Sequence, residues 1–177
     1  MRVWCSTLTV MLGLLLTANC AKRPESGRTQ VAVDSLPLQS FDRPPEQPFD
    51  RSDYVIGFKQ MGSFYDVPGE FGHYVDGEEY GFKSLSIIMS ETRPNGGPPL
   101  HTHETEEAHV LFSGTVEYII GDRRFTVEGP YVVRIPAGVP HAFLNVGKQP
   151  ATMTAVFPSG RLTYKEIEAN PLVREIR

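Results

Sequence analysis

The sequence predicts an all-β protein whose strands form a sandwich or a barrel. From residue 54 onward, short apolar runs rich in β-branched and aromatic residues alternate with Gly, Pro, Asn and Asp, which is typical of strands joined by turns. The runs of strand length are 83–90, 108–112, 115–120, 124–127, 131–135, 142–146 and 151–157. Gly121-Asp122, between the third and fourth runs, is a hairpin signal and indicates antiparallel neighbours.

The C-terminal residues are predicted to be helical. Residues 162–169 mix apolar and charged positions as a short helix would, and Pro171 ends the pattern. The sequence shows no internal repeat and no second domain. We therefore expect one barrel domain at 54–160, followed by a short helical tail at 161–177.

The N-terminus has the features of an export signal. Arg2 supplies a positive charge, and the apolar run that follows is shorter than the roughly 20 residues that span a bilayer. The segment ends in Leu16-Thr-Ala-Asn-Cys20, which resembles a bacterial lipobox that leaves Cys20 as a lipid-modified first residue. Plain secretion is the alternative. We expect residues 1–19 to be a signal peptide and the protein to reach the periplasm of a bacterium, free or anchored through Cys20.

Residues 20–53 are expected to form a disordered, proline-rich tether. Five prolines lie there among Ser, Gln, Arg and Asp, with few side chains able to build a core. A spacer of this kind suits a domain that is held near a membrane by a lipid anchor.

Charge and cysteine content narrow the classes of protein further. The formal net charge is −4, and removing residues 1–19 takes away Arg2 and no acid, which gives −5. An acidic chain without a Lys/Arg cluster argues against nucleic acid as a partner. Of the two cysteines only Cys20 would remain, so the fold has no internal disulfide and depends on its core.

Histidine and glutamate residues gather in the middle of the chain. His101, His103, Glu107 and His109 lie at positions of equal parity, so an extended chain would present them on one face. Another imidazole, His141, lies in a second stretch that contains Pro and Gly. Three imidazoles and one carboxylate suit a divalent transition metal such as Fe, Mn, Ni, Cu or Zn, whereas Ca and Mg prefer oxygen ligands.

The regular spacing extends beyond these side chains. The first stretch runs His101-x-His103, three residues, Glu107, six residues, Gly114, and the second runs Pro136-x-Gly138, two residues, His141, three residues, Asn145. On these motifs the chain, from about 84 to 157, resembles the cupin superfamily, and in particular single-domain quercetin-dioxygenase-like cupins. The resemblance implies a double-stranded β-helix, or jelly-roll barrel, in which one metal ion is bound by His101, His103, Glu107 and His141.

Two positions depart from the family's motifs. Asn95 stands at the opening glycine of the first motif, and asparagine is the residue that best replaces glycine in the left-handed conformation. Pro130 stands at the first glycine of the second motif, where its φ of about −65° should change the turn. Both departures concern turns and leave the four ligands in place.

Several residues near the motifs have two explanations. His109 can be a base beside the metal or a hydrogen-bonded core histidine. Five residues can either line a substrate cavity or only pack in the core: Leu111, Tyr118, Phe143, Asn145 and Met153. His73 lies outside both motifs and is expected at the surface or at a sheet edge.

The ligand set points to chemistry at an open metal site. Four protein ligands leave one or two coordination positions for water or substrate, and one carboxylate leaves a formal charge of roughly +1, which favours anionic or enolisable oxygen donors. We expect a dioxygenase-type oxidoreductase that acts on a small organic molecule, with Glu107 and His109 as catalytic candidates. A metal-dependent isomerase or decarboxylase, and a periplasmic ligand-binding protein without turnover, are alternatives because cupins include all of them. The resemblance also implies a homodimer.

Overall fold

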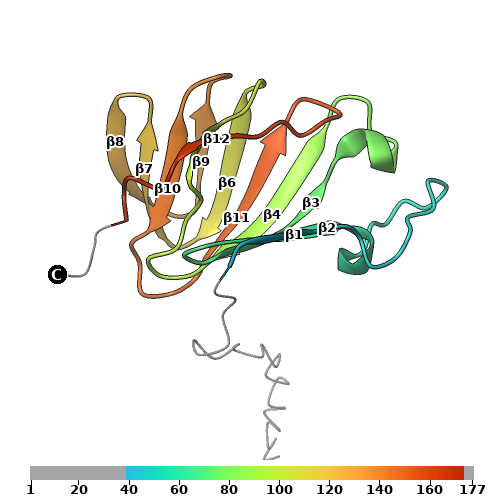
Figure 1. Ribbon diagram of the computed structural model, residues 1–177, viewed down its shortest axis with the longest axis horizontal. Coiled ribbons are helices and arrows are strands. Elements are labelled where there is room, and N and C mark those ends of the chain that lie inside the picture. Colours follow the sequence, from blue (N-terminus) through green and yellow to red (C-terminus); the bar gives the residue numbers. More distant parts are fainter. Residues whose placement is uncertain (1–38, 174–177) are drawn as a thin grey trace, which may run out of the picture. The chain divides into compact units, whose positions relative to one another are not determined.

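The computed structural model describes residues 39–173, which form two antiparallel β-sheets (Figure 1). The strands of the first sheet are β1 (Phe41–Arg43), β2 (Gly62–Asp66), β3 (Glu70–Val75), β4 (Ser86–Thr92), β6 (Glu107–Ser113), β9 (Tyr131–Ile135) and β11 (Ala151–Phe157). The strands of the second are β5 (Leu100–Thr102), β7 (Thr115–Ile120), β8 (Arg123–Glu128), β10 (His141–Asn145) and β12 (Lys165–Glu168). Two short 3-10 helices, η2 (Phe58–Gln60) and η3 (Gly77–Tyr80), flank β2 and β3.

The strand order is that of a jelly roll. It runs β1-β2-β3-β4-β11-β6-β9 in the first sheet and β12-β5-β10-β7-β8 in the second. From β4 to β12 the chain therefore alternates between the sheets, except that the β7–β8 hairpin stays within the second sheet, and this confirms the predicted double-stranded β-helix. Hydrogen bonds do not join the two sheets of the described residues into one closed barrel.

All seven predicted strands are present. The hairpin prediction is also confirmed, because β7 and β8 pair from Ile120 and Arg123 outward across Gly121-Asp122. Gly121 has φ of 59°, in the left-handed region that glycine adopts without steric cost. The strands β1, β2, β3, β5 and β12 were not expected from the sequence.

The predicted C-terminal helix is wrong. Residues 165–168 form β12, which pairs with β5 at the edge of the second sheet and carries a register shift between Glu166 and Glu168. A short isolated helix is marginal in water, whereas an edge strand satisfies the backbone of β5 directly. The aromatic and β-branched residues Tyr164 and Ile167 also favour the strand.

The expected tether does not continue unchanged to residue 53. Within its described part, β1 pairs with β2 at the edge of the first sheet, and Phe49 packs against a buried cluster of Met61, Val75 and Tyr80. Single apolar side chains among the prolines are therefore enough to pack this segment against the rest of the domain. The predicted signal peptide at 1–19 and the anchor residue Cys20 lie outside the described residues.

The main core lies between the two sheets. Its buried members come from five central strands and are Leu111, Val116, Tyr118, Val133, Ile135, Phe143, Ala151 and Met153. Their alternation along each strand follows the two-residue period of a sheet with one buried face. No helix in the described part of the chain has both the length and the apolar character needed to cross a membrane.

The segment between β4 and β5 fixes the position of β10. Asn95 has φ of 62°, which confirms that asparagine occupies a left-handed turn position here. Its backbone N–H donates to the carbonyl of Asn145 at 2.8 Å, and the N–H of Asn145 donates to the carbonyl of Gly96 at 2.9 Å. Gly97 lies so close to β10 that a Cβ atom there would be 1.9 Å from the carbonyl oxygen of Phe143. The glycines thus allow a close approach that holds the strand beginning at His141.

Candidate metal centre

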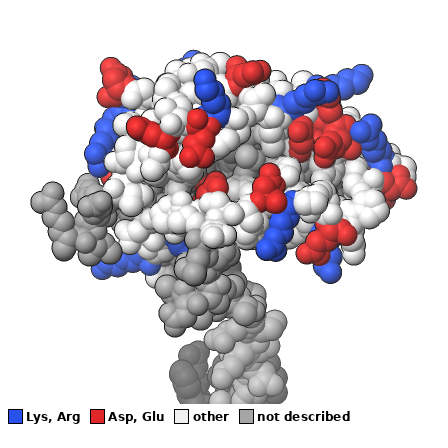
Figure 2. Space-filling view, in the orientation of Figure 1, with Lys and Arg blue, Asp and Glu red and all other residues white. Residues whose placement is uncertain are grey.

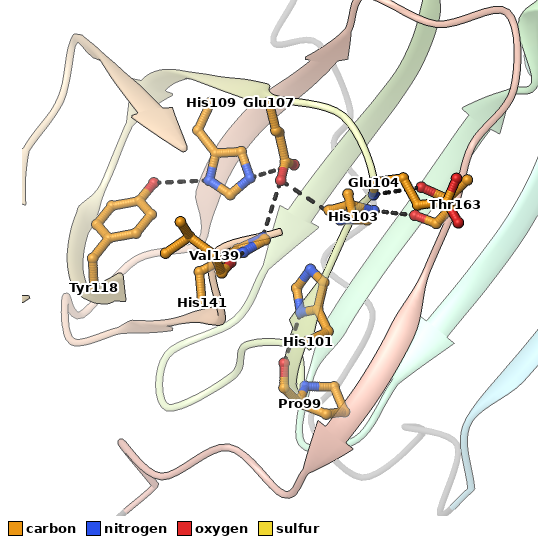
Figure 3. A network of polar contacts seen from close by, with 10 residues as sticks. All are labelled: Pro99, His101, His103, Glu104, Glu107, His109, Tyr118, Val139, His141 and Thr163. Carbon is orange, nitrogen blue, oxygen red and sulfur yellow. Dashed lines mark hydrogen bonds and ion pairs between the residues drawn. The ribbon is translucent and has the colours of Figure 1, made fainter. Parts of the chain in front are cut away.

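The four predicted ligands converge at one end of the two sheets (Figure 3). His101 lies on β5, His103 follows it, and Glu107 and His141 are the first residues of β6 and β10. One ligand atom from each lies within 4.8 Å of the ligand atoms of the other three, and all four side chains are buried.

The chain does not stay extended through this segment, as the parity argument assumed. It bends at residues 104–105 between His103 and Glu107, and the bend returns the carboxylate to the imidazoles. His141 reaches the group from the neighbouring strand, where it is the register partner of His101.

Hydrogen bonds fix the tautomer of each ligand histidine. The Nδ1 atom of His101 lies 2.8 Å from the carbonyl oxygen of Pro99, and that of His141 lies 2.9 Å from the carbonyl oxygen of Val139. The Nδ1 atom of His103 contacts the carbonyl oxygen of Thr163. A carbonyl oxygen only accepts, so each Nδ1 carries the proton and each Nε2 keeps a free lone pair. This arrangement orients all three Nε2 atoms for a metal ion.

Two buried atoms in the group lack a hydrogen-bond partner. Glu107 Oε2 lies 3.0 Å from His141 Nε2 and 3.6 Å from His103 Nε2, yet neither Glu107 Oε2 nor His141 Nε2 makes a hydrogen bond of acceptable geometry. Unpaired buried polar atoms are rare because each loses its hydration. A divalent transition metal would satisfy both atoms at once, so the residues fit the ion that the motif implies.

The protonation states of the site also suit a metal. Burial, with a further contribution from the His141 ring, lowers the pKa of His101 to about 3, and burial likewise lowers the pKa of His103. Burial opposes ionisation of Glu107, but the nearby His109 and the hydrogen bond that it donates hold the pKa of Glu107 well below its ordinary value. At neutral pH His101 and His103 are therefore neutral imidazoles and Glu107 is a carboxylate, which are the ligating forms.

His109 holds the other oxygen of the ligand carboxylate. Its Nε2 lies 2.6 Å from Glu107 Oε1, and its Nδ1 lies 3.3 Å from the hydroxyl oxygen of Tyr118 (Figure 3). An ionised carboxylate accepts, so His109 Nε2 donates and Glu107 Oε2 stays directed at the imidazoles. His109 is absent from the group of four ligands, and the structure makes it a buried residue that positions Glu107.

We expect the His109→Ala variant to bind a divalent transition metal about 10- to 100-fold more weakly, because ligands that lose such an outer partner bind less well. Competition with a chromophoric chelator measures this loss. The His109→Gln variant, which keeps an N–H donor, should recover part of the affinity, and Tyr118→Phe should change it less. Unaltered affinity in His109→Ala would leave His109 with a packing role only.

An open cavity of about 580 Å³ leads to the ligand group. Of the predicted lining residues, Phe143 and Met153 do face it, together with Ile88 and Ala155, and they form an apolar floor. Leu111 and Tyr118 belong to the core instead. Asn145 is structural, because its Nδ2 donates to the carbonyls of Thr92 and Gln149, both at 2.8 Å.

Sequence reasoning missed the residues that form the cavity walls. Tyr164, before β12, stacks on His101 with ring centroids 4.7 Å apart, and Glu70 at the start of β3 is buried. Neither residue belongs to a motif. The only signal for these walls in the sequence was a set of acidic residues. They lie at the ends of strands that the sequence did not predict.

Glu70 should make stability depend on pH. Burial raises its pKa to about 8, and the charge of Asp66 adds to this effect, while a hydrogen bond with Ser90 acts against it. Because the folded pKa exceeds the unfolded value, the unfolded chain ionises first, and stability falls as the pH rises from about 4.5 to 8. Between pH 5 and pH 7, the free energy of unfolding of the metal-free natural protein should fall by about 2 to 3 kcal/mol relative to that of metal-free Glu70→Gln, which has no carboxyl group to ionise at this position.

Denaturant unfolding of both metal-free proteins at the two pH values measures this difference. The comparison cancels the titration of the histidines, which both proteins share. An equal difference at pH 5 and pH 7 would contradict a neutral buried Glu70.

The comparisons with known proteins agree with this geometry. Residues 88–157 match the family model described as Cupin domain. An oxalate decarboxylase from Lactobacillus farciminis, in complex with formate, aligns with a TM-score of 0.56 at 19% identity over 60% of this chain and 33% of that chain. The fold is that of a cupin. The match to the cupin domain contains all four candidate ligands.

Other solved structures share this fold. A single-residue variant of Bacillus subtilis oxalate decarboxylase aligns with a TM-score of 0.54 at 17% identity, over 58% of this chain and 29% of that chain. An oxalate oxidase aligns with a TM-score of 0.53 at 22% identity, over 58% of this chain and 57% of that chain. The chain thus spans about a third or less of the length of the decarboxylases. A search of curated proteins found no match.

Proposed function

We propose that this cupin binds one divalent transition metal and acts as a dioxygenase-type oxidoreductase on a small organic oxygen donor. The observation that supports this most is the convergence of three free Nε2 atoms and one unpaired carboxylate oxygen at an open cavity of about 580 Å³. A structural metal site would be closed by protein ligands, whereas here space remains beside the ligand group.

The chain's own residues would bind and orient the substrate. When bound, the metal would supply Lewis acidity, open coordination positions and, for Fe, Mn, Ni or Cu, electron transfer. The apolar floor of Phe143, Met153 and Ala155 excludes water from the far side of the cavity. Glu107 can accept a proton from a substrate hydroxyl, because His109 stabilises either charge state of the carboxylate through its hydrogen bond to Oε1.

The proposed reaction is balanced without an external reductant. An electron-rich enediol or catechol supplies all four electrons that dioxygen accepts, one carbon–carbon bond of the substrate breaks, and both oxygen atoms enter the products. The protein needs only to hold the substrate's two oxygen donors beside the metal and to remove their protons.

Oxygen uptake tests this proposal. Protein loaded separately with Fe, Mn, Ni or Cu should consume one dioxygen per substrate with a catechol or enediol, and the zinc-loaded protein should not. A lack of uptake with all four redox-active metals would contradict it.

The similarity to oxalate decarboxylase makes metal-dependent decarboxylation the second candidate. Release of carbon dioxide with no net consumption of oxygen would favour it. Thermal stabilisation by a ligand without any turnover would favour a binding protein.

We also propose that the protein is exported and anchored through Cys20, on the basis of the lipobox-like sequence that ends at this residue. Radiolabelled palmitate should be incorporated into the natural protein in a bacterial host and not into a Cys20→Ser variant. Labelling of both proteins, or of neither, would contradict the anchor.

A further inference from the structure

We propose that the substrate of this cupin carries a protonated amine in addition to its oxygen donors, and that the carboxylates of the cavity wall bind that amine. The inference rests on the proposed function, because it names the class of substrate for the same metal site. This class of substrate differs from the anionic ligand that the formal charge of the metal site, taken alone, would favour.

Carboxylates line the cavity from its mouth to its base. The lining includes Asp42, Asp66, Glu70, Asp76, Glu107 and Glu166. Asp42 and Glu166 are exposed at the mouth, Asp66 is half-buried, and Glu70 and Glu107 are buried beside the floor. In Figure 2 acidic side chains border the hollow near the middle of the drawn face, between the positions that β12 and β1 take in Figure 1.

Within the described residues, none of these carboxylates forms an ion pair with Lys or Arg. The lining contains no Lys and no Arg, and within residues 39–173 the Arg–carboxylate ion pairs are Arg124 with Glu117 and Arg161 with Glu78, which lie outside the cavity. Burial, and after it the charges of Glu166 and Asp42, raise the pKa of Asp66 to about 6, so its carboxylate is repelled by these neighbours. A bound cation would relieve this repulsion.

Two buried carboxylate oxygen atoms without a hydrogen-bond partner are the second sign of a missing ligand. Asp76 Oδ1 and Glu107 Oε2 both belong to cavity-lining residues and lack a hydrogen-bond partner. A metal accounts for Glu107, but the carboxylates on β1, β2 and β3 are not among the four candidate ligands. A ligand with a metal-binding end and a cationic end would satisfy both parts of the site.

Aromatic rings favour the same kind of ligand. Phe41, Phe64 and Tyr164 line the cavity, and aromatic faces attract cations. The guanidinium carbon of Arg43 lies 4.0 Å from the Phe41 centroid, so this ring is partly taken by a cation of the chain itself. Acidic and aromatic groups together form the usual setting for an organic ammonium ion, and a dicarboxylate would meet like charges on the wall.

Matched catechols test the proposal. Zinc-loaded protein, which has no redox chemistry, would be titrated by calorimetry at pH 7.5 with 4-(2-aminoethyl)catechol, 4-methylcatechol and 4-(carboxymethyl)catechol. We expect the aminoethyl compound to bind at least about tenfold more tightly than the carboxymethyl compound, with the methyl compound between them.

Variants assign the preference to the wall. Asp66→Asn and, independently, Glu166→Gln should each reduce the ratio of the two affinities by about threefold or more. Glu128→Gln, which removes one exposed carboxylate on β8 away from the cavity, should leave the ratio unchanged. Thermal unfolding of each variant shows that it is folded.

Three outcomes would overturn the inference: equal or tighter binding of the carboxymethyl compound, no binding of the aminoethyl compound at millimolar concentration, or an unaltered ratio in both wall variants. These results are independent of turnover. A preference for the amine without oxygen uptake by any metal-loaded form would overturn the proposed reaction and leave the ligand class standing.

Discussion

The His101→Ala variant should bind a divalent transition metal more than about 100-fold more weakly than the natural protein. This loss is larger than the one expected for His109→Ala, which removes a partner of a ligand and not a ligand itself. The His101→Ala substitution deletes one of three Nε2 donors from a group whose atoms lie within 4.8 Å of one another. It also removes the ring on which Tyr164 stacks. Elemental analysis after dialysis against a chelator measures the metal content of the purified protein.

His73→Ala is the matched control. His73 is half-buried on β3, between β2 and β4 and not at a sheet edge, and its ring centroid lies 4.6 Å from that of Phe58. It is outside the ligand group, so its removal should leave the metal content unchanged. Full metal content in His101→Ala would contradict the assignment of the site.

The Gly97→Ala substitution should lower the free energy of unfolding by about 3 kcal/mol, which is in the upper part of the range for substitutions that overpack a site. The added methyl group would lie 1.9 Å from the carbonyl oxygen of Phe143 and 3.1 Å from Nδ2 of Asn170, which donates to that carbonyl. Backbone atoms on β10 would have to move, and His141 would move with them. Metal affinity should therefore fall together with the free energy of unfolding.

Gly57→Ala is the control for this change. Gly57 is exposed and has φ of −82°, and a Cβ atom there would lie 3.4 Å from Oε1 of the flexible Gln60 side chain. Its stability should change by less than about 1 kcal/mol in either direction. Equal effects of the two substitutions, measured by denaturant unfolding, would show that the close approach at Gly97 is unimportant.

The central strands and the grouping of the four candidate ligands were predictable because local patterns encode them. Alternating β-branched runs specify half-buried strands, and the spacing of His101, His103 and Glu107 specifies a ligand set that one bend brings together. Asn95 was predictable as well, since few residues other than glycine tolerate its left-handed conformation.

The edges of the sheets were not predictable in this way. β1, β5 and β12 are three or four residues long, too short for a period to emerge, and they form because neighbouring strands offer unpaired backbone groups. The charge of the cavity depends on these pairings too. Asp66 and Glu70 are register partners in one hairpin, and Glu166 reaches the cavity only through the pairing of β12 with β5.

The contact of Thr163 with His103 shows where proteins with this cupin fold can differ from one another. The segment that matches the family ends at residue 157, yet the carbonyl that orients one ligand ring comes from residue 163. A fragment trimmed to residues 88–157 would retain every candidate ligand and lose the parts that orient His103 and line the rest of the cavity. Flanking strands can therefore change the accepted substrate while the ligand motif stays constant, so two proteins with identical motifs need not share a substrate.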